Sequence, residues 1–165
     1  MRKLLILAGS LLGGTLAFAC GDKVMLVMGS RSSQIKPVHP ASILAYPGHS
    51  ASAPLIRNLP SQPWVKKAGH RFQVVDDPQQ LDAALKVGKY DVVVADIADA
   101  PGLSQEVWSA ASKPVLLPVL YAASKEEQSA ARKKFHCLLK APASVDNYLD
   151  GIDQAIELKL KKMTR

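Results

Sequence analysis

The sequence lacks the features that mark several classes of protein. No apolar run reaches the ~20 residues of a membrane-spanning helix, and the chain has no internal repeat or low-complexity tract. The four histidines and two cysteines have no zinc-site spacing. The basic residues are not accompanied by an RNA-binding aromatic motif or a helix-turn-helix pattern. We therefore expect no metal site, no cofactor and no nucleic acid partner.

Patterns for hydrolytic catalysis are missing as well. The stretch "GHSAS" holds Ser50 and Ser52 but is not the G-x-S-x-G turn that exposes a nucleophilic serine. No general base can be assigned to either hydroxyl from the sequence. The chain is therefore not expected to be an enzyme.

The N-terminus carries a recognisable pattern. Arg2 and Lys3 precede a short apolar run that contains glycine, and Ala17-Phe18-Ala19 stands directly before Cys20. A basic start, an apolar stretch and a small-x-small site are typical of a secretory signal peptide. We expect three segments: a signal peptide (1–19), an N-terminal extension or linker (20–40) and a folded domain (41–165).

Cys20 leaves two alternatives open. Ordinary cleavage after Ala19 would release the chain into the periplasm, whereas lipidation of Cys20 would tether it to a membrane surface. Ala17 stands where bacterial lipoboxes usually carry Leu, Val or Ile, so neither alternative is favoured. Cys137 could pair with Cys20 in an oxidising compartment, but its apolar run "FHCLL" is more typical of a buried free thiol.

Positive charge is in excess, with 21 Lys and Arg against 14 Asp and Glu. Such an excess suits anionic lipid, cell-wall acids or nucleic acid. Much of it lies in Arg132-Lys133-Lys134 and in the tail, at Lys159, Lys161, Lys162 and Arg165. We expect these side chains only to solvate helix faces.

From Ala41 onward, apolar strand patterns alternate with helix patterns. The expected strands cover residues 42–46, 71–75, 90–95, 114–120 and 136–139. The expected helices cover residues 52–67, with proline interruptions, and 78–87, 104–112, 125–135 and 145–160. Such alternation predicts an α/β domain with a parallel sheet buried on both faces. Right-handed crossovers then favour a doubly wound, flavodoxin-like three-layer sandwich with strand order 2-1-3-4-5.

Ligands of such folds bind beyond the carboxyl ends of the strands, and Asp96 follows the third expected strand. The surrounding "GKYDVVVADI" resembles the third strand of the receiver domain of two-component response regulators. "KPVLLPVLYAAS" is similar to the fourth receiver strand and "FHCLLKAP" to the fifth. The resemblance covers about residues 41–160. It implies that Asp96 stands in the place of the phosphoacceptor and Lys140 in that of the lysine that contacts the phosphoryl group.

Other receiver features are absent from the sequence. The two acidic residues that follow the first receiver strand and help to hold magnesium are replaced by Tyr46, Pro47 and Gly48. Val119 or Leu120 replaces the hydroxyl residue that ends the fourth strand. Magnesium needs carboxylate charge close by, and phosphoryl transfer depends on neutralising the moving group. We therefore expect no phosphorylation.

A buried carboxylate at Asp96 still needs a partner, because an unpaired one costs several kcal/mol. We expect that partner to be Lys140, in an ion pair across a degenerate pocket. The chain is then predicted to be a non-catalytic, exported pseudo-receiver in signal transduction. It would sense a ligand or bind a protein through the last-helix side of the domain. The alternative is a genuine phosphoacceptor receiver that uses Asp96.

Overall fold

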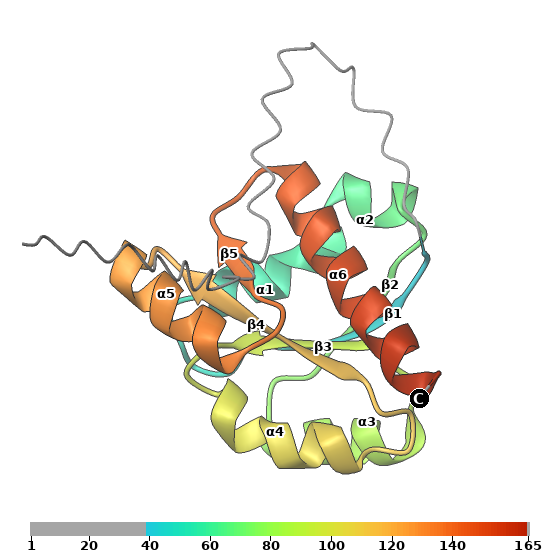
Figure 1. The fold of residues 1–165 in the computed structure, drawn as a ribbon. Coiled ribbons are helices and arrows are strands. Elements are labelled where there is room, and N and C mark those ends of the chain that lie inside the picture. Colours follow the sequence, from blue (N-terminus) through green and yellow to red (C-terminus); the bar gives the residue numbers. More distant parts are fainter. Residues whose placement is uncertain (1–38, 165) are drawn as a thin grey trace, which may run out of the picture. The chain divides into compact units, whose positions relative to one another are not determined.

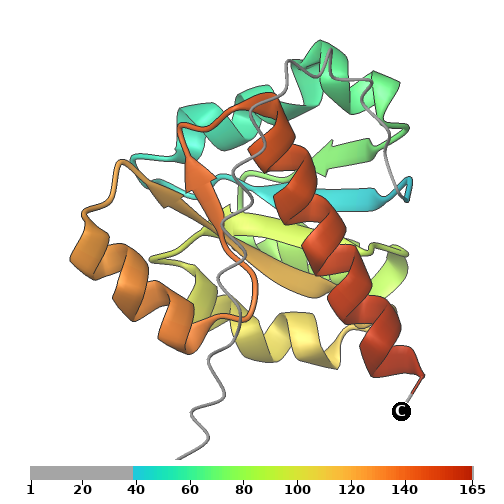
Figure 2. The ribbon, with the colours of Figure 1, turned by 45° about the horizontal axis from the view of Figure 1, so that its top comes forward.

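The structure, a computed structural model, describes residues 39–164. A five-stranded parallel sheet, in the order β2-β1-β3-β4-β5, lies between helices on both of its faces (Figures 1 and 2). The strands are β1 (Ser42–Tyr46), β2 (Arg71–Val74), β3 (Val92–Asp96), β4 (Val115–Tyr121) and β5 (Leu139–Ala141). The predicted fold class and strand order are confirmed. The predicted signal peptide, Ala19, Cys20 and most of the predicted linker lie outside the described residues.

The helices follow the strands in alternation. They are α1 (Ala53–Asn58), the 3-10 helix η1 (Leu59–Ser61), α2 (Pro63–Lys67), α3 (Pro78–Val87), α4 (Ala100–Ser109), α5 (Lys125–Lys134) and α6 (Val145–Met163). Asp77, Ser124 and Ser144 cap α3, α5 and α6, since each side chain accepts a hydrogen bond from a first-turn amide. Within residues 39–164, no helix has the length and apolarity needed to cross a membrane.

Two elements, α4 and β5, begin three or four residues away from the predicted start. Helix α4 begins at Ala100 instead of residue 104, because Pro101 fits the first turn of a helix. Strand β5 covers Leu139–Ala141 instead of residues 136–139. The apolar run before it is buried in part without being a strand: Cys137 is buried, and its thiol donates to the Leu116 carbonyl at 3.4 Å.

The hydrophobic core is divided by the sheet into two clusters. Val92 and Val94 of β3 face a cluster formed with α1, η1, α2 and α6. Val93 and Ala95 face a second cluster formed with α3 and α4. The buried members of both clusters lie within residues 41–156, so the compact unit Ser33–Arg165 contains the whole described core.

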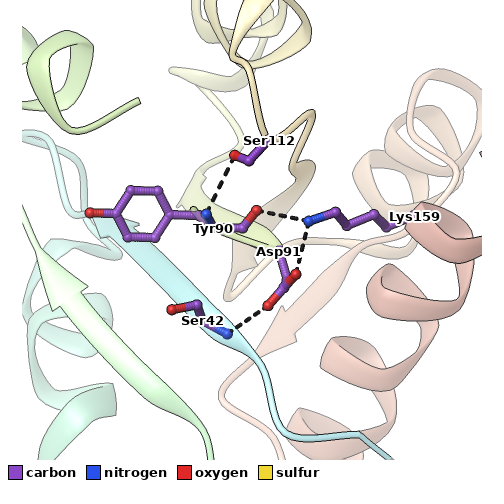
Figure 3. Close-up of polar contacts among 5 residues, drawn as sticks. All are labelled: Ser42, Tyr90, Asp91, Ser112 and Lys159. Atoms are coloured by element: carbon purple, nitrogen blue, oxygen red, sulfur yellow. Dashed lines mark hydrogen bonds and ion pairs between the residues drawn. The ribbon is translucent and has the colours of Figure 1, made fainter. Parts of the chain in front are cut away.

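Helix α6 is fastened to the start of the central strand by a polar network (Figure 3). The Lys159 ammonium donates to the Asp91 carboxylate at 2.8 Å and to the Tyr90 carbonyl at 2.9 Å. The amide of Ser42, at the start of β1, donates to the other Asp91 oxygen at 2.8 Å. Only 13% of the Lys159 side chain is exposed. The expectation that the tail lysines only solvate the helix is therefore wrong for Lys159, and Arg165 lies outside the described residues.

The network also determines the titration of Asp91. Burial by itself would raise the pKa of this carboxyl group. The Lys159 hydrogen bond, supported by the Ser42 amide and by the charges of Lys159 and Arg71, outweighs burial and holds the pKa below its ordinary value. A depressed carboxyl pKa contributes stability above the ordinary Asp pKa, and that contribution is lost as the pH falls through the folded-state pKa.

We predict that Lys159→Met lowers the free energy of unfolding by about 1–2 kcal/mol at neutral pH. The variant leaves Asp91 without its cation, and the loss is limited because Asp91 reaches water. Lys161→Met is the matched control, since the Lys161–Glu157 pair is 3.8 Å long and exposed, and we expect it to change stability by less than ~0.5 kcal/mol. Urea unfolding at neutral pH and below pH ~3 tests both points. The difference between wild type and Lys159→Met should shrink in acid; a difference that persists there would contradict this account.

Candidate functional site

The candidate site lies at the carboxyl edge of the sheet, where β1 and β3 end next to each other. Asp96 is the last residue of β3 and is 6% exposed. Tyr46 ends β1 and pairs in register with Ala95. Because β2 lies on the far side of β1 and β4 on the far side of β3, the chain connections diverge at this point. Doubly wound folds place their ligands at such a point.

Both oxygens of the Asp96 carboxylate are held by neutral donors. The Ser52 hydroxyl donates to Oδ2, and the Ala98 amide donates to Oδ1 at 2.8 Å. Ser52 is fully buried just before α1, and its Oγ lies 3.1 Å from the Oγ of Ser50. Asp96 therefore joins the loop after β1 to the loop after β3. From the sequence, Ser52 was considered only as a candidate nucleophile and set aside. Its position soon after the first strand was a usable signal for this contact.

The predicted ion pair between Asp96 and Lys140 is not formed. Asp96 is in register with Val119, and Val119 with Leu139, so these three side chains share one face of the sheet. Side chains alternate between faces along a strand, which puts Lys140 on the opposite face. Lys140 is exposed. Ala141, two residues after Leu139, stands on the same face as Asp96, so a methyl group lies where the lysine was expected.

A second carboxylate adds negative charge beside Asp96. Asp99 lies against Gly48, whose φ is +58°, and a Cβ at Gly48 would collide with the Asp99 carboxylate. Asp99 Oδ2 is buried and has no hydrogen-bond partner among the described residues. Burial, and then the charge of Asp96, raise the pKa of Asp99, and His49 opposes the shift. Burial, with Asp99 as the next cause, also raises the pKa of Tyr46.

These residues do not fit the magnesium site that a receiver fold implies. Magnesium prefers several oxygen ligands in octahedral geometry, with carboxylate charge among them. Asp96 already accepts a hydrogen bond on each oxygen, and the residues after β1 offer no carboxylate. Within residues 39–164, no group of three or more His, Cys, Asp or Glu side chains is arranged to hold a metal ion.

Solved structures resemble this fold. NtrX from Brucella abortus, crystallised in complex with ATP, matches with a TM-score of 0.60 at 19% identity, over 76% of this chain and 28% of that one. The signal receiver domain of a modulated diguanylate cyclase from Desulfovibrio desulfuricans G20 matches with a TM-score of 0.52 at 16% identity, over 75% of this chain and 99% of that one. The chain has the fold of a response-regulator receiver domain. No protein-family model and no curated protein matches the sequence.

The receiver resemblance therefore holds for the architecture, and the pocket departs from it at particular residues. Asp96 occupies the end of the central strand, as the resemblance implied. Lys140 does not reach Asp96, and Ser52 takes its place as the side chain that contacts the carboxylate. Through its hydrogen bonds with Ser52 and Ala98, Asp96 joins the loop after β1 to the loop after β3.

A double-mutant cycle tests which side chain is the partner of Asp96. We predict that Ser52→Ala and Asp96→Asn each lower the free energy of unfolding by about 1–3 kcal/mol, because the first leaves Asp96 Oδ2 without its donor and the second replaces the ionised acceptor of the Ser52 hydroxyl by a neutral amide. The two changes should couple by roughly 0.5–3 kcal/mol. Lys140→Met is the control and should be additive with Asp96→Asn within ~0.5 kcal/mol. Stability is measured by chemical denaturation. If Asp96→Asn couples to Lys140→Met and not to Ser52→Ala, the Asp96–Lys140 ion pair is supported and this account is wrong.

Proposed function

We propose that this chain is a non-catalytic receiver-like module of signal transduction, which acts by protein contact and not by accepting a phosphoryl group. One observation carries the proposal: the Asp96 carboxylate is held by the Ser52 hydroxyl and the Ala98 amide, with Ala141 on its face in place of a lysine. Phosphoryl transfer depends on positive charge that neutralises the moving group. Within the described residues, no lysine or arginine forms an ion pair with Asp96, and its two hydrogen bonds come from neutral groups.

The partner is proposed to bind the side of the domain formed by α5, β5 and α6. Helix α5 buries a single residue, Ala131, so its remaining surface is open to a partner. Lys125, Arg132 and Lys133 are exposed on it, and Lys140 is exposed on β5. A surface of this charge favours an acidic protein partner, mainly through the rate of encounter.

We predict that the purified chain gains no phosphoryl group when it is incubated with magnesium and acetyl phosphate, as measured by intact mass. A receiver domain with a complete acidic pocket, treated in parallel, shows that the reagents are active. Magnesium with beryllium fluoride, which mimics a phosphorylated aspartate, should likewise leave the amide spectrum around Asp96 unchanged.

The competing function is a phosphoacceptor receiver that uses Asp96. It would produce an adduct in wild type that is absent from Asp96→Asn, together with saturable shifts at Ala98 and Ser52 in the fluoride titration. These two results together would overturn the proposal, because they would show that a ligand can replace the Ser52 hydroxyl at the Asp96 carboxylate.

Export is proposed from the sequence of the first twenty residues. Arg2, Lys3 and the Ala17-Phe18-Ala19 site support removal of residues 1–19, followed by release into the periplasm or lipidation of Cys20. Intact-mass analysis of the protein from its native host should show a chain that begins at Cys20. An added diacylglycerol and acyl chain would identify the lipoprotein form. An uncleaved chain recovered from the cytosol would contradict both forms.

A further inference from the structure

The amino edge of the sheet, opposite the Asp96 site, carries an unusual combination of exposed side chains. Parallel strands begin at this edge, and the helices that follow them end there (Figures 1 and 2). We define the amino-edge patch by three apolar residues and three basic ones: Val87, Trp108, Met163, Lys113, Lys134 and Lys162. All six are exposed, with Trp108 64% and Met163 70% exposed.

Contacts between elements hold this patch together. The Lys162 ammonium of α6 lies 5.7 Å from the ring centroid of Trp108 of α4. Trp108, Lys134 and Lys162 line one shallow cavity, together with Pro114, the neighbour of Lys113. The ends of α3 and α4 line a second cavity, to which Lys86, the neighbour of Val87, and Ser109, the neighbour of Trp108, contribute. Figure 1 shows the ends of α3, α4 and α6 at one corner of the fold.

The patch carries positive charge that no carboxylate neutralises. Lys113, Lys134 and Lys162 form no ion pair within the described part of the chain. Asp91 and Glu157 pair with Lys159 and Lys161, while Glu106 of α4 lines the second cavity, is exposed and forms no ion pair within the described part of the chain. Asp96 and Asp99 lie at the opposite, carboxyl edge of the sheet.

The helix macrodipole accounts for lysines in the last turn of a helix, but not for the apolar members of the patch. On α6, Leu149, Ile152 and Ile156 form a buried stripe at helical spacing, and Met163 continues that stripe beyond Lys159. Lys159 already contacts the start of β3, so Met163 projects past the sheet with no core to cover it. Tryptophan next to lysine, with further apolar side chains, is the composition that inserts into the headgroup region of a bilayer.

The preceding chain also enters the domain at this edge. Pro40 lies against Gly69, just before β2, where a Cβ on Gly69 would stand 3.4 Å from the proline ring. The described part of the chain therefore starts on the side of the domain that carries the patch.

We propose that the amino-edge patch docks the domain onto an anionic lipid bilayer. Lys113, Lys134 and Lys162 contact acidic headgroups, while Trp108 and Met163 enter the interface between headgroups and acyl chains. The proposal does not depend on whether Asp96 accepts a phosphoryl group or on whether Cys20 is lipidated. Docking in this orientation leaves the Asp96 edge facing away from the membrane.

Vesicle binding of residues 33–165, the unit that contains the whole core, tests the proposal without the N-terminal segment. We expect binding to vesicles that contain phosphatidylglycerol, weakening as salt is added, and little binding to pure phosphatidylcholine. Lys134→Gln with Lys162→Gln should weaken binding about 25-fold, since each lysine near an anionic surface contributes about fivefold. The matched control, Lys125→Gln with Lys140→Gln, removes the same charge from exposed positions outside the patch and should change binding less than about twofold.

Tryptophan fluorescence provides a second measurement. Quenching by brominated lipid requires Trp108 to enter the bilayer, so electrostatic attraction alone does not produce it. Trp108 is exposed and Trp64 is buried, so brominated lipid should quench wild type and leave Trp108→Phe unquenched. Absence of binding to anionic vesicles, equal losses in the two double variants, or no quenching of Trp108 would each overturn the proposal. The proposal would also be wrong if the protein bound a DNA duplex or an acidic protein more tightly than vesicles and if Lys134→Gln with Lys162→Gln abolished that binding. The patch would then bind a different partner.

Discussion

The complete burial of β3 is the constraint on which the rest of the structure depends. All five residues from Val92 to Asp96 are buried, so alternate side chains must fill cores on both faces, and the polar groups at the two ends must find partners inside the fold. Asp91 and Asp96 bracket the strand, and each is held by elements distant in sequence. Lys159 and the Ser42 amide bind the first, and Ser52 and the Ala98 amide bind the second. The two contacts attach α6, β1 and the start of α1 to the central strand.

Asp91 has a charged partner, whereas Asp96 has only neutral partners. The two ends of the central strand therefore differ in how the carboxylate charge is compensated. Lys159 lowers the pKa of Asp91 against the effect of burial, so its charge is compensated where the strands begin. Asp96 has only neutral donors, and the raised pKa of Asp99 reports burial together with uncompensated negative charge beside it. The exposed lysines Lys134 and Lys162 lie on the opposite side of the sheet, at the ends of α5 and α6.

Most of the fold could be predicted because its signals are local. Continuous apolar runs such as Val92–Val94 identify strands buried on both faces, and Asp77, Ser124 and Ser144 mark helix starts by capping. The register of β5 could not be predicted, because "FHCLLKAP" is apolar over more residues than the strand uses, and a shift of one residue moves Lys140 to the other face. Ser52 was missed as a partner because its contact crosses 44 positions of the chain. Lys159 could have been found, since it continues the spacing of the buried stripe on α6.

The identity of Asp96 follows from hydrogen bonding without any appeal to phosphorylation. A carboxylate offers acceptors on both oxygens, and the site presents two donors, the Ser52 hydroxyl and the Ala98 amide. An asparagine of the same shape could keep its oxygen toward the Ala98 amide only by turning its NH₂ group toward Ser52, whose hydroxyl would then have to accept and turn its own proton away, for example to Ser50. The Ala98 donor belongs to the backbone and cannot be removed by substitution. Aspartate is therefore the side chain that satisfies this loop as it stands, and its presence at the end of the central strand is a consequence of how the loop is built.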